Sequence, residues 1–271
     1  MLLKDKLIEV QGEGKAILAT NFYNFETLKG VLQAAAALNS PIILQLTQSS
    51  IDYMGLENAV SMAQTGLKYF NVEGWVHLDH GGSVELAEQC LKAGFDSVMF
   101  DGSELSLEEN IEKTKRVVKL AKNYSANVEA ELGYIAKLGQ SKEKVFFTEV
   151  ADAKIFAKET GVNALAVAIG TAHGFYKSEP KLDFVRLEEL KNATSVPLVL
   201  HGGSGVPGES VRKAVSLGIC KLNVATEIKN IFMQTLKELL SQNTEIDLRK
   251  VFPPATEAVA KLVQDKLLLV K

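Results

Sequence analysis

The sequence PLVLHGGSG at residues 197–205 joins an apolar run to a histidine and a glycine-rich turn. Two further stretches repeat this pattern, VHLDHG at 76–81 and AVAIGTAHG at 166–174. The histidines that follow these apolar runs are His80, His173 and His201. Short apolar runs bounded by turn residues are typical of buried strands, so each histidine is predicted at the end of a strand. Because three converging imidazoles can bind a catalytic metal ion and leave one position open, the pattern predicts a metal site.

Eight short apolar or β-branched runs alternate with longer amphipathic stretches along the chain. The predicted strands are Ala16–Thr20, Pro41–Leu46, Gly74–Asp79, Asp96–Asp101, Asn127–Glu131, Ala164–Ile169, Pro197–Leu200 and Ile219–Asn223. Eight βα units of this length fit an α/β fold, the (β/α)8 TIM barrel, in a single domain over residues 1–271. A doubly wound open sheet is the main alternative. It would place a glycine-rich turn after the first strand, and residues 19–22 read Ala-Thr-Asn-Phe.

The composition excludes several classes of protein. A net charge of −3 without a basic run gives nucleic-acid binding little support. No run approaches the roughly 18 apolar residues that a membrane span needs, and charges interrupt the start MLLKDKLIEV, which makes it a poor signal peptide. Cys90 and Cys220 form no CxxC motif, so a reduced, cytoplasmic compartment is the simplest interpretation.

Several connecting segments have predicted roles of their own. Gly94, Gly161 and Gly218 are predicted to end helices that lead into the next strand. The polar, glycine-punctuated segment Tyr134–Val145 is predicted to be a mobile loop over the site. The last amphipathic stretch, Thr256–Leu269, is predicted to be a helix that packs on the barrel or on a partner subunit.

The third to eighth predicted strands all end in residues that can bind a metal or move a proton. These residues are Asp79 and His80, Asp101, Glu131, His173, His201 and Asn223. Each has a structural explanation when taken alone, such as capping the next helix. Active sites of parallel barrels lie at the carboxyl ends of the strands, so six consecutive strands of this kind point to function.

The polar residues of the third strand are predicted to lie on two different faces of that strand. Asp79 directly precedes His80, so alternation predicts that it points to the other side, where it could act as a general acid or base. His77 shares the face of Asp79, and a packing role explains it equally well. Asp101 and Glu131 could hold a second cation or orient the histidine ligands.

Glycine-rich and helix-opening segments follow the seventh and eighth predicted strands. The residues concerned are Gly202, Gly203, Ser204 and Gly205, then Asn223, Val224, Ala225 and Thr226. Barrels often bind phosphate at this position, with backbone N–H groups and a helix N-terminus. Together with the metal site, this predicts an enzyme for a phosphorylated carbonyl compound, whose carbonyl the metal would polarise, stabilising an enediolate.

At these residues the chain resembles the class II, zinc-dependent ketose-bisphosphate aldolases over nearly its whole length. The matching motifs are HLDHG at 77–81, FDGS at 100–103, EAELG at 129–133, ALAVAIGTAHG at 164–174, PLVLHGGSG at 197–205 and KLNVATE at 221–227. The resemblance implies reversible cleavage of a phosphorylated ketose of the fructose or tagatose 1,6-bisphosphate type. The products would be dihydroxyacetone phosphate and an aldehyde such as glyceraldehyde 3-phosphate.

The resemblance also implies roles for single residues. His80, His173 and His201 would bind the catalytic Zn²⁺, and Asp79 would exchange the proton of the C4 hydroxyl. Asp101 and Glu131 match positions that bind a second or alternate metal ion. The positions matched to dihydroxyacetone phosphate binding are Gly174, Gly202, Gly203, Ser204, Asn223, Val224, Ala225 and Thr226. Asn223 would hydrogen-bond the enediolate, and a monovalent cation, Na⁺ or K⁺, would bind nearby. Thr47 stands where relatives carry a serine that contacts the second phosphate. Members of the family are homodimers or homotetramers.

Three departures from the family pattern bear on the substrate. Relatives follow the ELG motif with a GGxED loop whose glutamate moves a proton, and here Glu143 is the nearest candidate. A DPR motif near the C-terminus becomes Asp247-Leu248-Arg249, with Arg249 a candidate for a distal phosphate across a subunit interface. Ala225 replaces an aspartate of many fructose-bisphosphate enzymes, whereas tagatose-bisphosphate relatives share the sequence NVAT.

Two alternatives stay open on the sequence. One is the same chemistry on another phosphorylated keto sugar or keto sugar acid, which a panel of substrates would separate. The other is a non-catalytic subunit that binds a metal or a sugar phosphate, in line with the missing acidic pair. The complete set of metal ligands and Asp79 argue against this second alternative.

Overall fold

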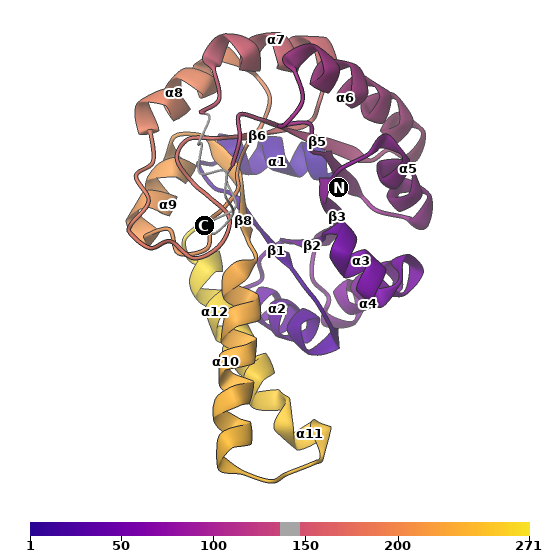
Figure 1. The fold of residues 1–271 in the computed structure, drawn as a ribbon, viewed down its shortest axis with the longest axis vertical. Coiled ribbons are helices and arrows are strands. Elements are labelled where there is room, and N and C mark those ends of the chain that lie inside the picture. Colours follow the sequence, from indigo (N-terminus) through magenta and orange to yellow (C-terminus); the bar gives the residue numbers. More distant parts are fainter. Residues whose placement is uncertain (136–146) are drawn as a thin grey trace.

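The eight strands form a closed parallel barrel (Figure 1). The computed structural model describes residues 1–135 and 147–271. The strands are β1 (Ile17–Asn21), β2 (Ile42–Leu46), β3 (Gly74–Gly81), β4 (Ser97–Phe100), β5 (Asn127–Leu132), β6 (Ala164–Val167), β7 (Leu198–Leu200) and β8 (Ile219–Val224). Each strand pairs with the next along the chain, and β8 pairs with β1. The predicted (β/α)8 TIM barrel is confirmed, and every predicted strand is present with ends that agree within two residues.

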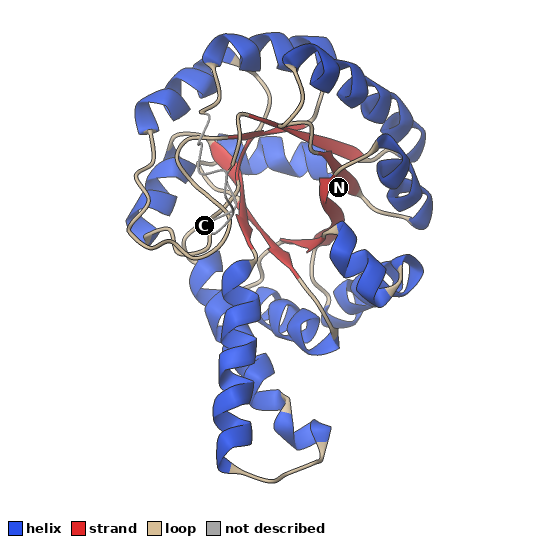
Figure 2. Cartoon of the chain, viewed as in Figure 1, coloured by secondary structure: helices blue, strands red, loops and turns tan. Residues whose placement is uncertain are grey.

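The helices pack against the barrel: most cover its outer side, and the first one lies across one of its ends (Figure 2). They are α1 (Leu3–Gly12), α2 (Phe25–Ala37), α3 (Gln48–Met54), α4 (Leu56–Phe70), α5 (Val84–Ala93), α6 (Leu107–Ala121), the short 3₁₀ turn Lys122–Tyr124, α7 (Val150–Thr160), α8 (Phe184–Ala193), α9 (Gly208–Ser216), α10 (Thr226–Gln242), α11 (Leu248–Val251) and α12 (Pro253–Leu267). The predicted glycine ends are confirmed, because Gly94, Gly161 and Gly218 have φ angles of +97°, +67° and +111° after α5, α7 and α9.

The inside of the barrel has an apolar layer and a polar layer. Leu3, Leu7 and Val10 of α1 pack with inward-facing residues such as Ile43 and Trp75. A second layer of buried side chains, toward the carboxyl ends of the strands, is polar. Its members are Gln45, His77, Ser97, Asn127, Glu129 and Lys221. Barrel interiors are usually filled by branched apolar side chains, and buried polar groups are costly unless they are hydrogen-bonded. The second layer therefore has to be a connected network.

The last three helices form an arm that extends away from the barrel (Figure 1). The predicted C-terminal helix is α12, which packs against α2 and α10. Gly30 of α2 makes this approach close, because a Cβ atom there would lie 2.7 Å from the carbonyl oxygen of Thr256. Farther along the arm Leu240 and Leu248 are more than half exposed.

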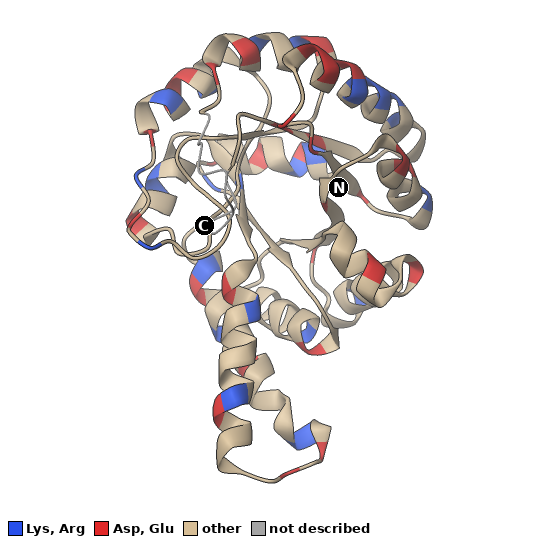
Figure 3. Cartoon of the chain, viewed as in Figure 1, with Lys and Arg blue, Asp and Glu red and all other residues tan. Residues whose placement is uncertain are grey.

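The outer surface is mixed in charge. Figure 3 shows acidic and basic residues interspersed along the outer helices. Within residues 1–135 and 147–271, no helix has both the length and the apolar character needed to cross a bilayer. Cys90 and Cys220 are buried free thiols.

Candidate functional site

The three histidines of the repeated sequence pattern converge at the carboxyl ends of the strands. The ring centroid of His80 lies 4.8 Å from that of His173 and 4.8 Å from that of His201. The centroids of His173 and His201 are 5.9 Å apart. One nitrogen from each ring lies within 4.8 Å of the others, a spacing that can hold a metal ion.

The backbone at His80 corrects one expectation of the sequence analysis. Asp79 and His80 do not point to opposite sides, because Asp79 Oδ1 lies 3.9 Å from His80 Nε2. The cause is local: His80 has a φ of +53°, and the pairing of β3 with β4 shifts register between Leu78 and Gly81. A left-handed conformation is uncommon for a residue other than glycine. It turns two consecutive side chains into the same site.

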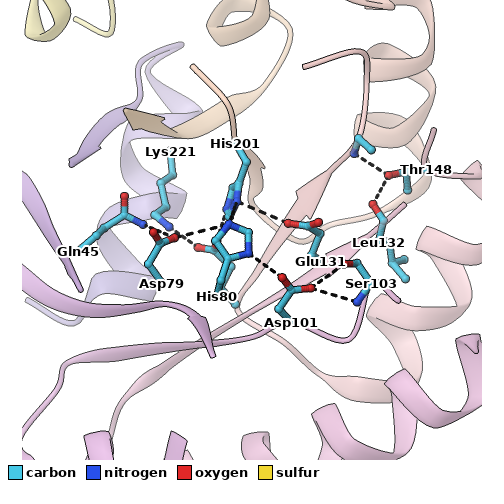
Figure 4. A network of polar contacts seen from close by, with 12 residues as sticks. Gln45, Asp79, His80, Asp101, Ser103, Glu131, Leu132, Thr148, His201 and Lys221 are labelled. Atoms are coloured by element: carbon cyan, nitrogen blue, oxygen red, sulfur yellow. Dashed lines mark hydrogen bonds and ion pairs between the residues drawn. The ribbon is translucent and has the colours of Figure 1, made fainter. Parts of the chain in front are cut away.

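A carboxylate orients the ring of His80. His80 Nδ1 donates to Asp101 Oδ2 at 2.7 Å, and Asp101 Oδ1 accepts from the Ser103 backbone and hydroxyl at 3.1 and 2.7 Å (Figure 4). Burial favours the neutral acid, but the bonds from His80 and Ser103 hold the pKa of Asp101 well below its usual value. The other ring nitrogen, Nε2, is therefore left facing the site.

Two of the converging histidines lie within hydrogen-bonding distance of each other. His201 Nδ1 is 3.1 Å from His80 Nε2. Burial lowers the pKa of His80, but Asp79 and Asp101 outweigh it and raise the pKa to about 9. Burial and the charge of His80 hold the pKa of His201 well below its usual value. With these pKa directions, a protonated His80 would donate to a neutral His201, and its proton would lie between two nitrogens suited to metal binding.

Glu131 adds a carboxylate that lacks a full set of partners. Burial, followed by repulsion from Asp101, raises its pKa to about 8. Its Oε2 atom lies 3.5 Å from His201 Nδ1 and accepts no hydrogen bond from the described part of the chain. Glu131, Asp101 and His80 form a second group with metal-binding spacing. A buried oxygen of this kind, beside imidazoles, fits a divalent cation.

Asp79 is held by two amides that the sequence analysis did not single out. Its Oδ2 accepts from Asn21 Nδ2 at 2.9 Å, and its Oδ1 accepts from Gln45 Nε2 at 3.1 Å. Burial favours the neutral acid, but the charge of His80 and the Asn21 bond lower the pKa of Asp79 below its usual value. The available sequence signal was an isolated polar residue on the inner face of each of β1 and β2.

A buried ion pair lies behind His201 and was also missed. His201 Nε2 lies 2.9 Å from Glu129 Oε1, and Lys221 Nζ lies 2.7 Å from Glu129 Oε2. Lys221 Nζ is also 3.3 Å from His77 Nε2, which gives His77 a place in this network. Glu129 stands two residues before Glu131, so strand alternation placed both on the inner face.

The loops after β6, β7 and β8 approach one another closely. A Cβ atom at Gly202 would lie 2.5 Å from the carbonyl oxygen of Ala172, and one at Gly203 would lie 2.8 Å from that of Asn223. The Tyr176 hydroxyl joins two loops, accepting from Ala172 N at 2.7 Å and donating to Gly202 O at 2.9 Å. These glycines are therefore required by the close approach of backbones.

The start of α10 lies against the loop after β7. Ser204 Oγ accepts from the backbone N–H groups of Ala225 and Glu227 at 3.3 and 3.4 Å. Thr226 is the first residue of this helix, and Val224 is the last residue of β8. Gly174, with a φ of +111°, follows His173 on the neighbouring loop. Ser204, Val224, Ala225 and Thr226 thus lie together at one helix N-terminus, whose partial positive charge favours an anion.

Three other predicted residues lie outside this cluster. Thr47 caps α3, with its Oγ1 accepting from Ser50 N at 3.4 Å. Arg249 lies on α11 at the end of the arm and forms a two-point ion pair with Asp247. Glu143, with most of the segment Tyr134–Val145, lies outside the described residues.

A cavity of about 330 Å³ opens beside the metal-binding group. His80, Asp101, Glu131 and His173 line its inner end, and Lys113 is among the other lining residues. It is large enough to admit a small polar molecule next to the histidines.

Comparison with protein families agrees with this geometry. The model of class II fructose-bisphosphate aldolase matches residues 2–271. The chain belongs to the class II fructose-bisphosphate aldolase family. This aldolase is therefore an enzyme, a carbon–carbon lyase. Its family is metal-dependent and acts on phosphorylated sugars, and the histidine group described above offers the aldolase a metal site.

Solved structures include similar proteins. The aldolase is 33% identical to the YdjI aldolase of Escherichia coli K12, with a TM-score of 0.89 over 99% of this chain and 96% of that one. A proposed fructose-1,6-bisphosphate aldolase of Coccidioides immitis is 27% identical, with a TM-score of 0.91 over 99% and 96% of the two chains. The fructose-bisphosphate aldolase of Campylobacter jejuni is 22% identical and shares the fold, with a TM-score of 0.83 over 99% and 93%.

The shared proton predicts how metal binding depends on pH. A divalent ion must displace the proton between His80 and His201, so affinity should fall about tenfold per pH unit below the His80 pKa of about 9 and level off above it. Calorimetric titration of the metal-free protein with Zn²⁺, in buffers of different ionisation enthalpy, counts the protons released. Binding at pH 7 without proton release would contradict the shared-proton arrangement.

Proposed function

We propose that this chain is a zinc-dependent aldolase that reversibly cleaves a ketose of the fructose or tagatose 1,6-bisphosphate type. The products would be dihydroxyacetone phosphate and an aldehyde such as glyceraldehyde 3-phosphate. The observation that carries this proposal is the distance of 3.9 Å between the Asp79 carboxylate and His80 Nε2, the ring nitrogen that faces His201. Cleavage needs a base next to the ion that polarises the carbonyl. We place this activity in one domain, residues 1–271, in the cytoplasm.

His80, His173 and His201 are the proposed zinc ligands. Three imidazoles are a common ligand set for catalytic zinc and leave one coordination position open. When bound, zinc supplies Lewis-acid polarisation of the ketose carbonyl. Asp101 orients His80, and with Glu131 it is proposed to hold a second or alternate divalent ion.

The dihydroxyacetone phosphate half is proposed to bind over the loops after β6, β7 and β8. The backbone N–H groups of Gly174 and Gly202 and of the N-terminus of α10 are proposed to bind the phosphate. Gly203, whose own N–H donates to Asn223 O at 2.9 Å, is proposed to let the backbone approach the phosphate closely. The remaining contacts are assigned to Ser204, Val224, Ala225 and Thr226. A monovalent cation, Na⁺ or K⁺, would balance the phosphate charge there.

Asp79 and Asn223 are the proposed catalytic residues. Asp79 carries a lowered pKa, so it is ionised and ready to accept the C4 hydroxyl proton during cleavage and to return it in condensation. Asn21 and Gln45 hold its two oxygens, which fixes the direction in which the carboxylate faces. Asn223 is buried, and its amide is proposed to hydrogen-bond the enediolate.

The distal end of the substrate is assigned to Thr47 and Arg249 in this proposal. Thr47 directly follows β2, and its hydroxyl is proposed to contact the second phosphate. Arg249 lies at the far end of the arm from its own barrel, so it could meet that phosphate only in another subunit (Figure 1). Ala225 lacks the carboxylate of many fructose-bisphosphate enzymes, which favours tagatose 1,6-bisphosphate or another phosphorylated keto sugar or sugar acid.

A substrate panel tests the proposed reaction. Zinc-loaded protein should cleave fructose or tagatose 1,6-bisphosphate and release dihydroxyacetone phosphate, and EDTA should abolish this cleavage. A coupled assay for dihydroxyacetone phosphate measures both rates side by side. Fully zinc-loaded protein that cleaves neither compound would contradict these substrates and transfer the proposal to other phosphorylated keto sugars.

Asp79→Ala separates proton transfer from metal binding. Because Asp79 is not among the proposed zinc ligands, this variant should keep zinc and lose cleavage by about 10²–10⁴-fold, as expected for a lost general base. His201→Ala serves as the contrasting variant and should lose both zinc and activity. Turnover of Asp79→Ala within tenfold of the unmodified enzyme would refute the role of Asp79.

The arm supports a homodimer or a homotetramer. Its exposed apolar residues, Leu240 at 53% and Leu248 at 61% exposure, would be covered by a second copy. Light scattering should give a mass that is a multiple of 29.5 kDa, and Leu240→Asp should reduce it. Ile155→Asp is the matched control, since Ile155 is 48% exposed on α7 of the barrel wall. A monomeric unmodified protein would contradict this assembly.

A further inference from the structure

In the buried network behind His201, the chemistry of the groups determines which atom donates and which accepts in each hydrogen bond. Lys221 is completely buried, and its Nζ atom lies 2.7 Å from Glu129 Oε2 and 3.3 Å from His77 Nε2. An ammonium group is only a donor. His77 Nε2 must therefore accept, which leaves the His77 proton on Nδ1, where it is donated to Ser97 Oγ at 2.8 Å.

The same reasoning extends to His201 through Glu129. With one carboxylate oxygen accepting from Lys221, the other accepts from His201 Nε2 at 2.9 Å, so Nε2 carries the proton. The lone pair of His201 is then on Nδ1. This atom lies 3.1 Å from His80 Nε2 and 3.5 Å from Glu131 Oε2, on the side where the proposed metal would bind.

We propose that Lys221 is a positioning residue that, through Glu129, fixes His201 as the Nε2–H tautomer and directs its Nδ1 lone pair at the metal. This inference rests on the proposed function for the identity of the metal site. Carboxylates commonly orient metal-binding histidines. Here the lysine supplies what the carboxylate alone lacks, a buried positive charge that keeps Glu129 an acceptor at both oxygens.

Replacement of Lys221 by an apolar residue should reverse this arrangement. Without the ammonium group, Glu129 Oε2 loses its donor at 2.7 Å, and the carboxylate is no longer held as an acceptor facing His201 Nε2. Glu131 Oε2, 3.5 Å from His201 Nδ1, is then a competing acceptor on the other side of the ring. The His201 proton would then move to Nδ1 and block the metal position. Lys221→Met should therefore convert His201 to the Nδ1–H tautomer and weaken Zn²⁺ binding by about 10–100-fold.

A double variant distinguishes this role from simple packing. In Lys221→Met with Glu129→Gln, no charge is left unpaired. The new amide can direct its NH₂ toward His77 Nε2, which lies 3.9 Å from Glu129 Oε2, and offer its oxygen to His201. The double variant should regain the Nε2–H tautomer and most of the zinc affinity. A packing role for the lysine stem would show no such recovery.

The experiment reads the tautomer directly. Nitrogen-15 NMR of the metal-free full-length protein reports which nitrogen of His201 carries the proton, and calorimetry gives the zinc affinity. Ser97→Ala is the matched control, because it changes the same network beyond His77 and should leave His201 unchanged.

Two results would overturn the proposal. One is an Nδ1–H tautomer of His201 in the unmodified protein, a result that needs no variant to fold. The other is an unchanged tautomer and unchanged zinc affinity in Lys221→Met. Because the tautomer is read without metal or substrate, either result is independent of whether the enzyme cleaves a ketose bisphosphate.

Discussion

The closed parallel pairing of the eight strands is the constraint on which the site depends. Parallel strands all end on the same face, so closure brings His80 and His201, which are 121 residues apart in the sequence, to within hydrogen-bonding distance. An open sheet would spread the same strand ends along a line. His201, at the end of β7, and the N-terminus of α10, after β8, are neighbours because β7 pairs with β8.

Within that frame, charge balance organises the interior. Carboxylates and histidines gather in a volume that excludes water, and each carboxylate that accepts hydrogen bonds raises or fixes the basicity of an imidazole. Asp101 acts on His80, and Glu129 acts on His201. Lys221 supplies a positive charge that balances the Glu129 carboxylate. The polar layer is therefore a connected network rather than a set of isolated buried groups.

The sequence predicted the barrel, its strands and the clustering of the strand-end residues, because apolar runs and their terminal polar residues follow simple periodicities. It did not predict the side to which His80 turns, since the identity of a residue does not reveal a left-handed backbone or a shift in strand register. Asn21, Gln45, Glu129 and Lys221 were missed for another reason. Strand alternation places them on the inner face, but it does not reveal which polar residues on that face meet across the barrel, because the contacts depend on the register of strands distant in sequence.

Helix α10 links two regions that differ in character. Its first turn lies against Ser204 at the mouth of the barrel, and its far end lies in the arm among exposed apolar residues. With 17 residues, it is a rod of about 25 Å. A rod of that length transmits tilt, so a rotation of about 2° about one end displaces the other by about 1 Å. A contact that tilts the arm would therefore also move the backbone N–H groups at the mouth of the barrel.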